Sequence, residues 1–496
     1  MLFNSLAYLI FFPIVAVCFF VFPKKYRWLW LLLCSFYFYM SWNVRYAGLM
    51  LLSIVITYTS GILLGRVNSG TADAKHKNVH RKLIVAGSFI TNLGILFFFK
   101  YFNFVNSLLA GISASFSAEW PVSDLNVLLP VGISFYTFQA LSYTIDVYYD
   151  RVKPETHFGY YALFVSFFPQ LVAGPIERTG RLLPQIKATP AFDSDRMRSG
   201  LASMWLGYFK KVVIADRVAV LVNTVYNDPG SYKGMPLIIA TLFFSIQIYC
   251  DFSGYSDIAI GSAKILGFNL MTNFDAPYFS KSISEFWRRW HISLSQWFRD
   301  CLYIPLGGSR VSKPRKYFNV FVVFLTSGLW HGASLNFIVW GALHGAYQIA
   351  GEILKPWRDR LLGFFRINGE TFVRAFIQIL MTYTFTCFAW IFFRANNLRD
   401  AIYIFRNIFN FNDMAPADTS LFTPGLDPKE FTLALASAAV LLLIDILSRK
   451  RDLFCCLVKR KLPIRWAVYI AAILCIIIFG SYGIGYDAAD FIYFQF

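Results

Sequence analysis

Long apolar runs recur along the whole of this 496-residue chain, and they limit its possible folds more than any other feature. A helix needs about 20 residues to cross the roughly 30 Å hydrocarbon layer of a bilayer. Runs of about this length occupy residues 2–22, 47–64, 83–99, 432–447 and 466–484. A secretory signal peptide would account for one run near the N-terminus, so the repetition indicates several membrane spans.

The composition agrees with a chain that is mostly embedded in lipid. Hydrophobic residues make up 57% of it, above the roughly 45–50% that is usual for soluble domains. We count roughly eleven to thirteen apolar segments and find no internal repeat. The sequence therefore predicts an all-α polytopic membrane protein. We expect a single membrane-embedded domain over residues 1–496, with a short outward-facing tail at 488–496.

The excess of positive charge, +18 in total, lies largely in short loops between the apolar runs. These loops fall near residues 24–27, 66–82, 310–316 and 449–465, and the positive-inside rule makes them cytoplasmic. The acidic, proline-rich loop at 410–430 should then lie outside, as should both termini. Charge that is divided among loops forms no continuous basic surface, so we expect no nucleic-acid partner.

Two segments are too polar to be ordinary spans. Residues 174–200 contain prolines and charges, which predicts a cytoplasmic-face loop or a re-entrant segment packed within protein. Residues 282–306 carry large apolar side chains at helical spacing with arginines among them, which favours a helix at the interface or one that dips into a cavity. A loop as long as residues 174–200 is usually functional or disordered.

A polar cluster interrupts the apolar residues 325–345, LTSGLWHGASLNFIVWGALHG. It contains Ser327, His331, Asn336 and His344. Burial disfavours the charged form of an imidazole, so a neutral His331 could act as a general base. A packing role, in which the imidazole bonds to a neighbouring carbonyl, stays open for both histidines.

Two further clusters place polar side chains among apolar ones. His291 follows Arg288 and Arg289, two arginines that suit phosphate groups or a solvated basic face. Residues 247–257, QIYCDFSGYSD, contain Gln247, Asp251 and Asp257; a buried carboxylate needs a partner, and pairing with arginine is the structural alternative to catalysis. The eight cysteines lie mostly in apolar runs without ligand spacing, and we expect no metal site.

Five motifs in order along the chain carry a family resemblance. They are LLPVGISFYTFQALSYTIDVYY from residue 128, FFPQLVAGPIER from 167, YCDFSGYSDIAIG from 249, FWRRWHISLSQWFRDCLYIPLGG from 286 and SGLWHGAS from 327. Together they resemble the bacterial branch of the membrane-bound O-acyltransferases. Within that branch they are most similar to the members that acetylate alginate, and more distantly to those that transfer D-alanine to teichoic acid.

The resemblance implies a role for particular residues. His331, in the WHG motif, would be catalytic, and His291, in the RRWH motif, would be its companion. It also implies helices around a central tunnel that joins a cytoplasmic acyl donor to an outward-facing acceptor. Residues predicted to line the tunnel or bind the donor are Arg288, Arg289, Ser327, Asn336, Asp251 and Gln247.

The expected function is transfer of an acyl group, acetyl above all, to hydroxyls of an extracytoplasmic polysaccharide or cell-wall glycan. The donor would be acetyl-CoA or an acyl-carrier thioester, used as substrate, with no permanently bound cofactor. An extracytoplasmic SGNH-type partner is expected, in a bacterial inner or plasma membrane. D-alanyl, lipid or protein O-acylation stays an alternative, as does a non-enzymatic transporter or flippase of a lipid-linked saccharide, although a transporter would favour inverted repeats.

The tail at 488–496, AADFIYFQF, is unusually apolar for a segment that should meet water. An aromatic membrane anchor explains it. The alternative is that Tyr493 offers its hydroxyl as an acyl acceptor at the outer mouth of the tunnel, where a tethered group has a high effective concentration.

The charge pattern predicts the orientation of the loops. Reporter tags placed after Lys77 and after Lys459 should read out in the cytoplasm, and a tag near Ala417 should read out on the opposite side, because basic loops are retained and acidic ones are not. Reporter fusions in intact cells measure this. Reversed signals at these sites would contradict the assignment of the donor side.

Overall fold

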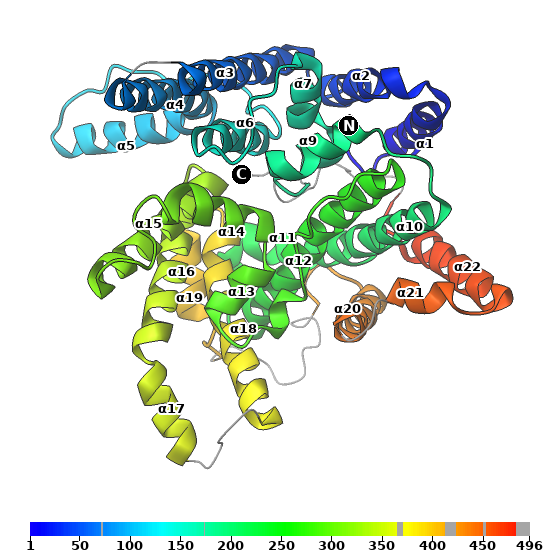
Figure 1. Cartoon of the computed structure of the whole chain (residues 1–496). Helices are drawn as coiled ribbons and strands as arrows, with labels where there is room; N and C mark the ends of the chain where they lie inside the picture. The colour runs from blue at the N-terminus through cyan, green and yellow to red at the C-terminus, as the bar shows by residue number, and fades with distance from the viewer. Residues whose placement is uncertain (71–72, 173, 365–370, 412–422, 450–452, 483–496) are drawn as a thin grey trace. The chain divides into compact units, whose positions relative to one another are not determined.

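The computed structural model describes residues 1–70, 73–172, 174–364, 371–411, 423–449 and 453–482. Within these ranges the regular secondary structure is helical and no strand occurs, which confirms the predicted all-α class. The chain divides into two compact units (Figure 1). Unit 1 comprises Met1–Ser203 and Ala259–Met271, and unit 2 comprises Met204–Ile258 and Thr272–Phe496.

Six helices in the described part of the chain are long and apolar enough to cross a bilayer. They are Val44–Ser69, Ala74–Ser115, Met235–Ile265, Phe372–Arg394, Pro428–Ser448 and Leu462–Phe479. Over most of their described residues the five predicted apolar runs are helical, and the first of them forms a helix shorter than 18 residues, Leu6–Val21. The multi-pass prediction is therefore confirmed. The 16-residue helix Ile133–Tyr148 is instead surrounded by protein, with its residues from Ile133 to Val147 all buried.

Unit 1 is built around α6 (Ile133–Tyr148), whose residues from Ile133 to Val147 are all buried. Helices α3, α4, α7 and α9 pack against it. The motif that begins at residue 128 thus forms the core of this unit. The other helices are α1 Leu6–Val21, η1 Lys24–Tyr26, α2 Arg27–Met40, α3 Val44–Ser69, α4 Ala74–Leu96, η2 Phe97–Tyr101, α5 Phe102–Ser115, α7 Phe158–Ser166, α8 Phe168–Leu171, α9 Thr179–Ala188 and the first part of α10 Ser194–Tyr208.

Unit 2 holds the long helix α12 as far as Ile258 and the segments that carry both predicted catalytic histidines. α15 lies beside α16, and α18 also packs against α16 (Figure 1). Its helices are η3 Phe209–Ala215, α11 Asp216–Asn227, η4 Pro229–Ser231, α12 Met235–Ile265, η5 Pro277–Phe279, α13 Ile283–Arg289, α14 Ile292–Phe298, η6 Arg299–Tyr303, α15 Lys313–His331, α16 Leu335–Ile353, α17 Lys355–Phe364, α18 Phe372–Arg394, α19 Leu398–Asn407, α20 Pro428–Ser448, α21 Leu453–Val458 and α22 Leu462–Phe479.

The segment 174–200, predicted as a loop or a re-entrant segment, is mostly helical. It contains α9 and the start of α10, and Pro184 lies inside α9. The expectation of a loop was wrong because one face of α9 is apolar: Leu182, Leu183 and Ile186 are buried. Burial of that face supports a helix that polar composition and proline alone argue against.

Two glycines allow α15 and α16 to approach closely. A Cβ atom on Gly341 would overlap the carbonyl oxygen of Phe324, and one on Gly328 would overlap the carbonyl oxygen of Phe337. In both cases the obstacle is backbone, which cannot move aside as a flexible side chain can. Small residues at such contacts are a common basis of helix association in membranes. This contact sets the position of His331, at the end of α15.

Replacement of Gly341 by alanine should destabilise the protein, by about 1–3 kcal/mol, because the new methyl group forces the two helices apart. Thermal unfolding of the detergent-purified chain measures the loss. Gly351→Ala is the matched control, since Gly351 lies on the same helix and an added Cβ there meets no atom within 4 Å. Equal unfolding temperatures for the two variants would contradict the close-approach argument.

Candidate active site

A break in the helix at His291 shapes the first half of the site. Helix α13 ends at Arg289, α14 begins at Ile292, and His291 between them has a φ angle of 44°, in the left-handed region. The predicted apolar face is confirmed, because Phe286, Trp287, Trp290, Leu294, Trp297 and Phe298 are all buried. The break itself was not predicted. It places His291 inside the protein with 0% exposure.

Asn273 fixes the orientation and the tautomer of His291. The Asn273 side-chain oxygen accepts a hydrogen bond from His291 Nδ1 at 3.2 Å and two more from Ser293, through its backbone N at 3.2 Å and its hydroxyl at 2.9 Å. An amide oxygen only accepts, so the imidazole carries its proton on Nδ1 and has its lone pair on Nε2. Burial lowers the pKa of His291 to about 3, which keeps the ring neutral at physiological pH.

His331 is the last residue of α15 and is also buried. Its ring packs against three aromatic rings, with centroid distances of 4.9 Å to Trp330, 5.0 Å to Trp340 and 5.4 Å to Phe393. The Trp330 ring also lies 6.0 Å from the His291 ring. Two histidines that are forty positions apart in the sequence thus contact one tryptophan.

His344 lies in the same aromatic surroundings but has a structural contact. Its Nδ1 atom accepts a hydrogen bond of 3.2 Å from Trp287 Nε1, and its ring lies 5.0 Å from that of Trp340. It is fully buried. The packing role that the sequence left open therefore has a specific partner at His344.

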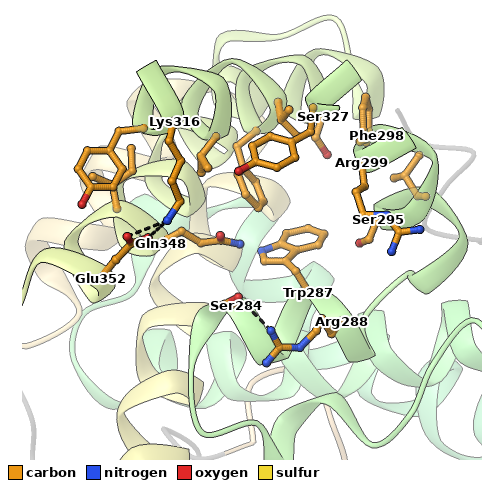
Figure 2. A pocket seen from close by; sticks show the side chains of 17 residues that line it. Ser284, Trp287, Arg288, Ser295, Phe298, Arg299, Lys316, Ser327, Gln348 and Glu352 are labelled. Atoms are coloured by element: carbon orange, nitrogen blue, oxygen red, sulfur yellow. Dashed lines mark hydrogen bonds and ion pairs between the residues drawn. The ribbon is translucent and has the colours of Figure 1, made fainter. Parts of the chain in front are cut away.

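A cavity of about 390 Å³ opens beside this aromatic cluster (Figure 2). Trp287 and Phe324 form part of its wall, and so does Ser327, which lies one helical turn before His331. The wall also carries Arg288, Arg299 and Lys316. Lys316 is paired with Glu352 at 2.7 Å and Arg299 with Asp300 at 2.8 Å. Arg288 is exposed, and its contact in the described structure is with the Ser284 hydroxyl at 3.4 Å.

The other predicted tunnel residues lie away from this cavity wall. Arg289 forms an ion pair with Glu285 at 2.9 Å, so the two adjacent arginines face different surroundings. Asn336 donates a hydrogen bond of 2.7 Å to the carbonyl of Ala395. Gln247 is buried within α12. Asn336 and Arg289 therefore have structural contacts, whereas Ser327 and Arg288 line the cavity.

Asp251 has a lysine as its partner, where an arginine was expected. Lys211 Nζ lies 2.8 Å from carboxylate oxygens of both Asp251 and Asp216, and the neighbouring Lys210 lies 2.7 Å from Asp257. Both lysines are buried and lie in η3, a π-helical turn. Sequence reasoning missed them, although two consecutive lysines within the apolar stretch around 209–215 were a visible signal. These ion pairs supply the partners that the buried carboxylates of Asp251 and Asp257 require.

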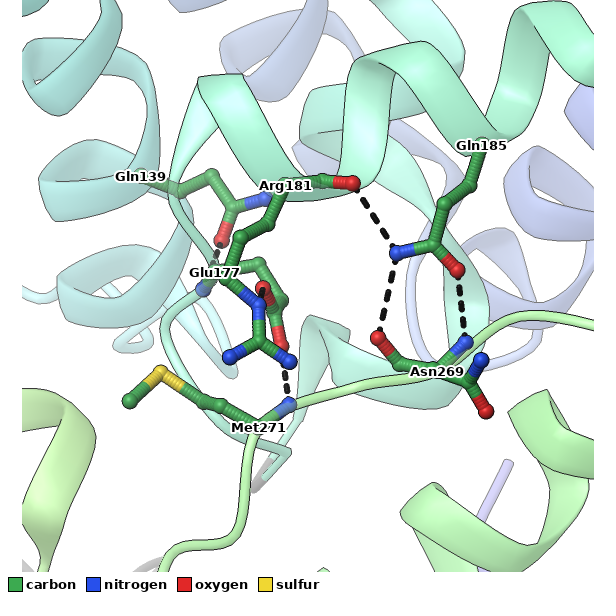
Figure 3. Close-up of polar contacts among 6 residues, drawn as sticks. All are labelled: Gln139, Glu177, Arg181, Gln185, Asn269 and Met271. Carbon is green, nitrogen blue, oxygen red and sulfur yellow. Dashed lines mark hydrogen bonds and ion pairs between the residues drawn. The ribbon is translucent and has the colours of Figure 1, made fainter.

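The GPIER part of the second motif forms a polar clamp in unit 1 (Figure 3). The backbone N of Glu177 donates to the Gln139 side chain at 3.2 Å, and the Glu177 carboxylate accepts from the backbone N of Met271. Gln185 exchanges two hydrogen bonds with the backbone of Asn269, at 2.7 and 3.1 Å. Burial raises the pKa of Glu177. These contacts tie α9 to α6 and to the residues after α12.

Tyr493 lies outside the described residues, so its role as acyl acceptor stays a prediction. The described residues also contain no group of three or more histidine, cysteine, aspartate or glutamate side chains placed to hold a metal ion.

A multi-pass membrane protein with two buried, ring-packed histidines beside a cavity is an arrangement suited to proton transfer away from water. Residues 149–393 match the family model described as MBOAT, membrane-bound O-acyltransferase family. The chain belongs to this family, and it is an acyltransferase.

Individual relatives are similar over most of the chain. A probable alginate O-acetylase of Azotobacter vinelandii is 36% identical, over 84% of this chain and 80% of the relative. A peptidoglycan O-acetyltransferase of Helicobacter pylori is 35% identical, over 80% of this chain and 75% of the relative. A teichoic acid D-alanyltransferase of Bacillus subtilis is more distant, at 27% identity over 54% of this chain and 69% of the relative.

Substitution of Asn273 should alter how acyl transfer depends on pH. In Asn273→Asp the acceptor oxygen remains, but a carboxylate beside His291 stabilises the imidazolium and raises its pKa from about 3. Activity should therefore decline on acidification at a higher pH than in the wild type, because His291 must stay neutral. Asn273→Ala should lose at least about tenfold in rate at every pH, since the tautomer is no longer fixed.

Acyl transfer by membranes that contain each variant, measured between about pH 5 and 8, separates these outcomes. A purely structural role for Asn273 would change the amount of folded protein and leave the shape of the pH profile as in the wild type. An unshifted profile for Asn273→Asp would contradict the role assigned to this contact.

Proposed function

We propose that this enzyme transfers an acetyl group from a cytoplasmic thioester to hydroxyl groups of an extracytoplasmic polysaccharide or cell-wall glycan. The observation that carries the proposal is the shared contact of His331 and His291 with Trp330, next to the cavity whose wall includes Ser327. Two of the relatives are O-acetylating enzymes by name, one for alginate and one for peptidoglycan. That likeness supports acetyl as the group and a surface glycan as the acceptor.

The cavity is the proposed donor site. Its basic rim suits the phosphate of coenzyme A or of a carrier-bound pantetheine arm, and Arg288 supplies a guanidinium without a carboxylate partner among the described residues. The apolar wall formed by Trp287, Phe324 and their neighbours suits the uncharged acyl end. The loop at 310–316, next to this cavity through Lys316, is cytoplasmic on the proposed topology.

The chemistry that we propose is general-base catalysis of the attack of a hydroxyl group on the thioester. His331 accepts the proton of the attacking hydroxyl while its oxygen forms a bond to the thioester carbonyl carbon. The carbon–sulfur bond then breaks, and the proton passes to the departing thiolate. The aromatic rings around His331 exclude water, which limits hydrolysis of the thioester.

His291 is proposed to orient the acceptor hydroxyl. Two other roles for His291 are orientation of the donor and polarisation of the thioester carbonyl. Polarisation needs an N–H directed at the carbonyl, and the proton on Nδ1 is held by Asn273. Nε2 carries a lone pair and can accept a hydrogen bond from a hydroxyl. The neutral tautomer therefore favours positioning of a reacting group over polarisation of the carbonyl.

On the outer side, we propose an acceptor relay. Tyr493 would receive the acyl group and pass it to an extracytoplasmic SGNH-type partner, with the enzyme in the bacterial inner or plasma membrane and both of its termini outside. D-alanyl transfer remains the second candidate for the transferred group, because a teichoic acid D-alanyltransferase is a more distant relative. Membership of an acyltransferase family argues against the transporter alternative.

His331→Ala should abolish acetyl transfer, a loss of at least about 10²-fold, because general-base catalysis contributes about that much. The chain should still insert and purify at the wild-type level. Transfer of isotope-labelled acetyl groups from a thioester to envelope glycans measures the effect. His344→Gln is the control, a second buried histidine in the same cluster whose replacement can still accept the Trp287 hydrogen bond.

The control should retain most of the wild-type turnover. A folded His331→Ala protein with normal turnover would overturn the proposed base. Loss of transfer in both variants would instead indicate that the aromatic cluster, and not His331 itself, is what the reaction requires.

A further inference from the structure

A second cavity of about 390 Å³ lies elsewhere in unit 2, between three helices that are long enough to span a membrane. Residues of α12, α18 and α20 form its walls, and Tyr278 and Phe279 of η5 close one side. Leu380 and Leu442 on its walls are exposed, so the groove opens toward the surroundings of these helices, which in a membrane are hydrocarbon. Its size is within the range of small-molecule sites.

The walls of this groove are apolar because its hydroxyl groups are turned toward the protein. Tyr278 donates a hydrogen bond of 2.6 Å to the carbonyl of Ser245, and the Tyr383 hydroxyl lies 2.7 Å from that of Ser245. The third, Tyr249, donates to Asp445 Oδ2 at 2.9 Å. The side-chain surface that faces the groove is therefore mostly apolar. It suits a hydrocarbon chain, which has no polar groups to satisfy.

One end of the groove carries two opposite charges, Asp445 of α20 and Arg449, which directly follows the end of this helix. Asp445 lines the groove; its Oδ2 atom accepts the Tyr249 hydrogen bond, and the nearby Lys210 attracts the same carboxylate. Arg449 stands at the rim, with its guanidinium 5.5 Å from the ring of Phe279, which also lines the groove. A carboxylate beside a guanidinium at the end of an apolar groove matches a head group that carries both an ammonium and a phosphate.

We propose that the groove binds one molecule of phosphatidylethanolamine. One acyl chain lies between α18 and α20, the ammonium donates to Asp445 and the phosphate pairs with Arg449. On the proposed topology this lipid belongs to the cytoplasmic leaflet, because Arg449 begins a basic loop. The lipid chain contacts Tyr278, whose ring lies 6.1 Å from that of Trp290, the residue before His291.

The head group explains why this lipid is preferred over two others. Phosphatidylcholine has the same charges, but its quaternary ammonium has no N–H to donate to Asp445. Phosphatidylglycerol has the phosphate but no ammonium that could donate a hydrogen bond to Asp445. Both interactions are available only to phosphatidylethanolamine among the three.

The test is native mass spectrometry of the full chain, purified in detergent and given each of the three lipids at equal concentration. We expect one tightly retained phosphatidylethanolamine, with at least fivefold less retention of the other two. Arg449→Gln changes an exposed residue, so folding should be unaffected, and it should lower phosphatidylethanolamine retention about fivefold, the effect of one basic group near a lipid phosphate.

A matched pair of variants tests the acyl-chain position. Ala438 lines the groove and Ala436, two positions earlier on α20, is exposed and does not. Ala438→Phe should fill the groove and abolish retention, whereas Ala436→Phe should leave it as in the wild type.

Three results would overturn the proposal: equal retention of all three lipids, tighter retention of phosphatidylglycerol, or equal effects of the two phenylalanine substitutions. Each would identify ordinary contact with bulk lipid, or attraction of anionic lipid to the basic loop. If Ala438→Phe does not fold, lipid selectivity and the Arg449→Gln result decide the question without it.

Discussion

The geometry of the candidate active site depends on one amide oxygen. Asn273 accepts three hydrogen bonds through it, one from His291 and two from Ser293. Its backbone carbonyl also accepts from Ile292 N at 3.0 Å, and Asp275 N donates to Arg289 at 3.0 Å. A left-handed residue other than glycine costs of order 1–3 kcal/mol, so these contacts must hold the turn in place. The same contacts choose the tautomer of His291, which links backbone conformation to proton chemistry.

Buried polar groups in unit 2 follow two different rules. The two buried lysines form opposite-charge pairs, Lys210 with Asp257 and Lys211 with Asp251, because an isolated charge in a low-dielectric interior is strongly unfavourable. His291 rests against the rings of Phe252 and Trp330, and burial keeps its pKa low enough for the ring to stay neutral. A proton acceptor that carries no charge at rest can be buried among tryptophans without a counter-ion. This explains how a reactive site can be dry while the neighbouring structure is ionic.

Much of the architecture could be predicted from sequence because it depends on local composition. The apolar runs predicted membrane-spanning helices. The motifs that resemble a known family singled out His331 and His291 as candidate site residues. The break at His291 could not be predicted, since it depends on Asn273, eighteen positions away, and helical spacing continues through it. Likewise, nothing local distinguishes Arg288 from Arg289. Their separate surroundings depend on the direction of each side chain from α13, one toward a cavity and one toward Glu285.

The buried lysine–aspartate pairs also bear on how the protein is made. Lys210 and Lys211 leave the ribosome about forty residues before their partners in α12. A lysine-bearing segment on its own would be costly to release into lipid, and so would a helix that carries two carboxylates. When the two segments stay together, the positive charges of Lys210 and Lys211 are balanced by the carboxylates of Asp257 and Asp251. The two segments should therefore leave the insertion machinery as one neutral hairpin, so that the order of biosynthesis, and not hydropathy alone, governs how this part of the chain enters the membrane.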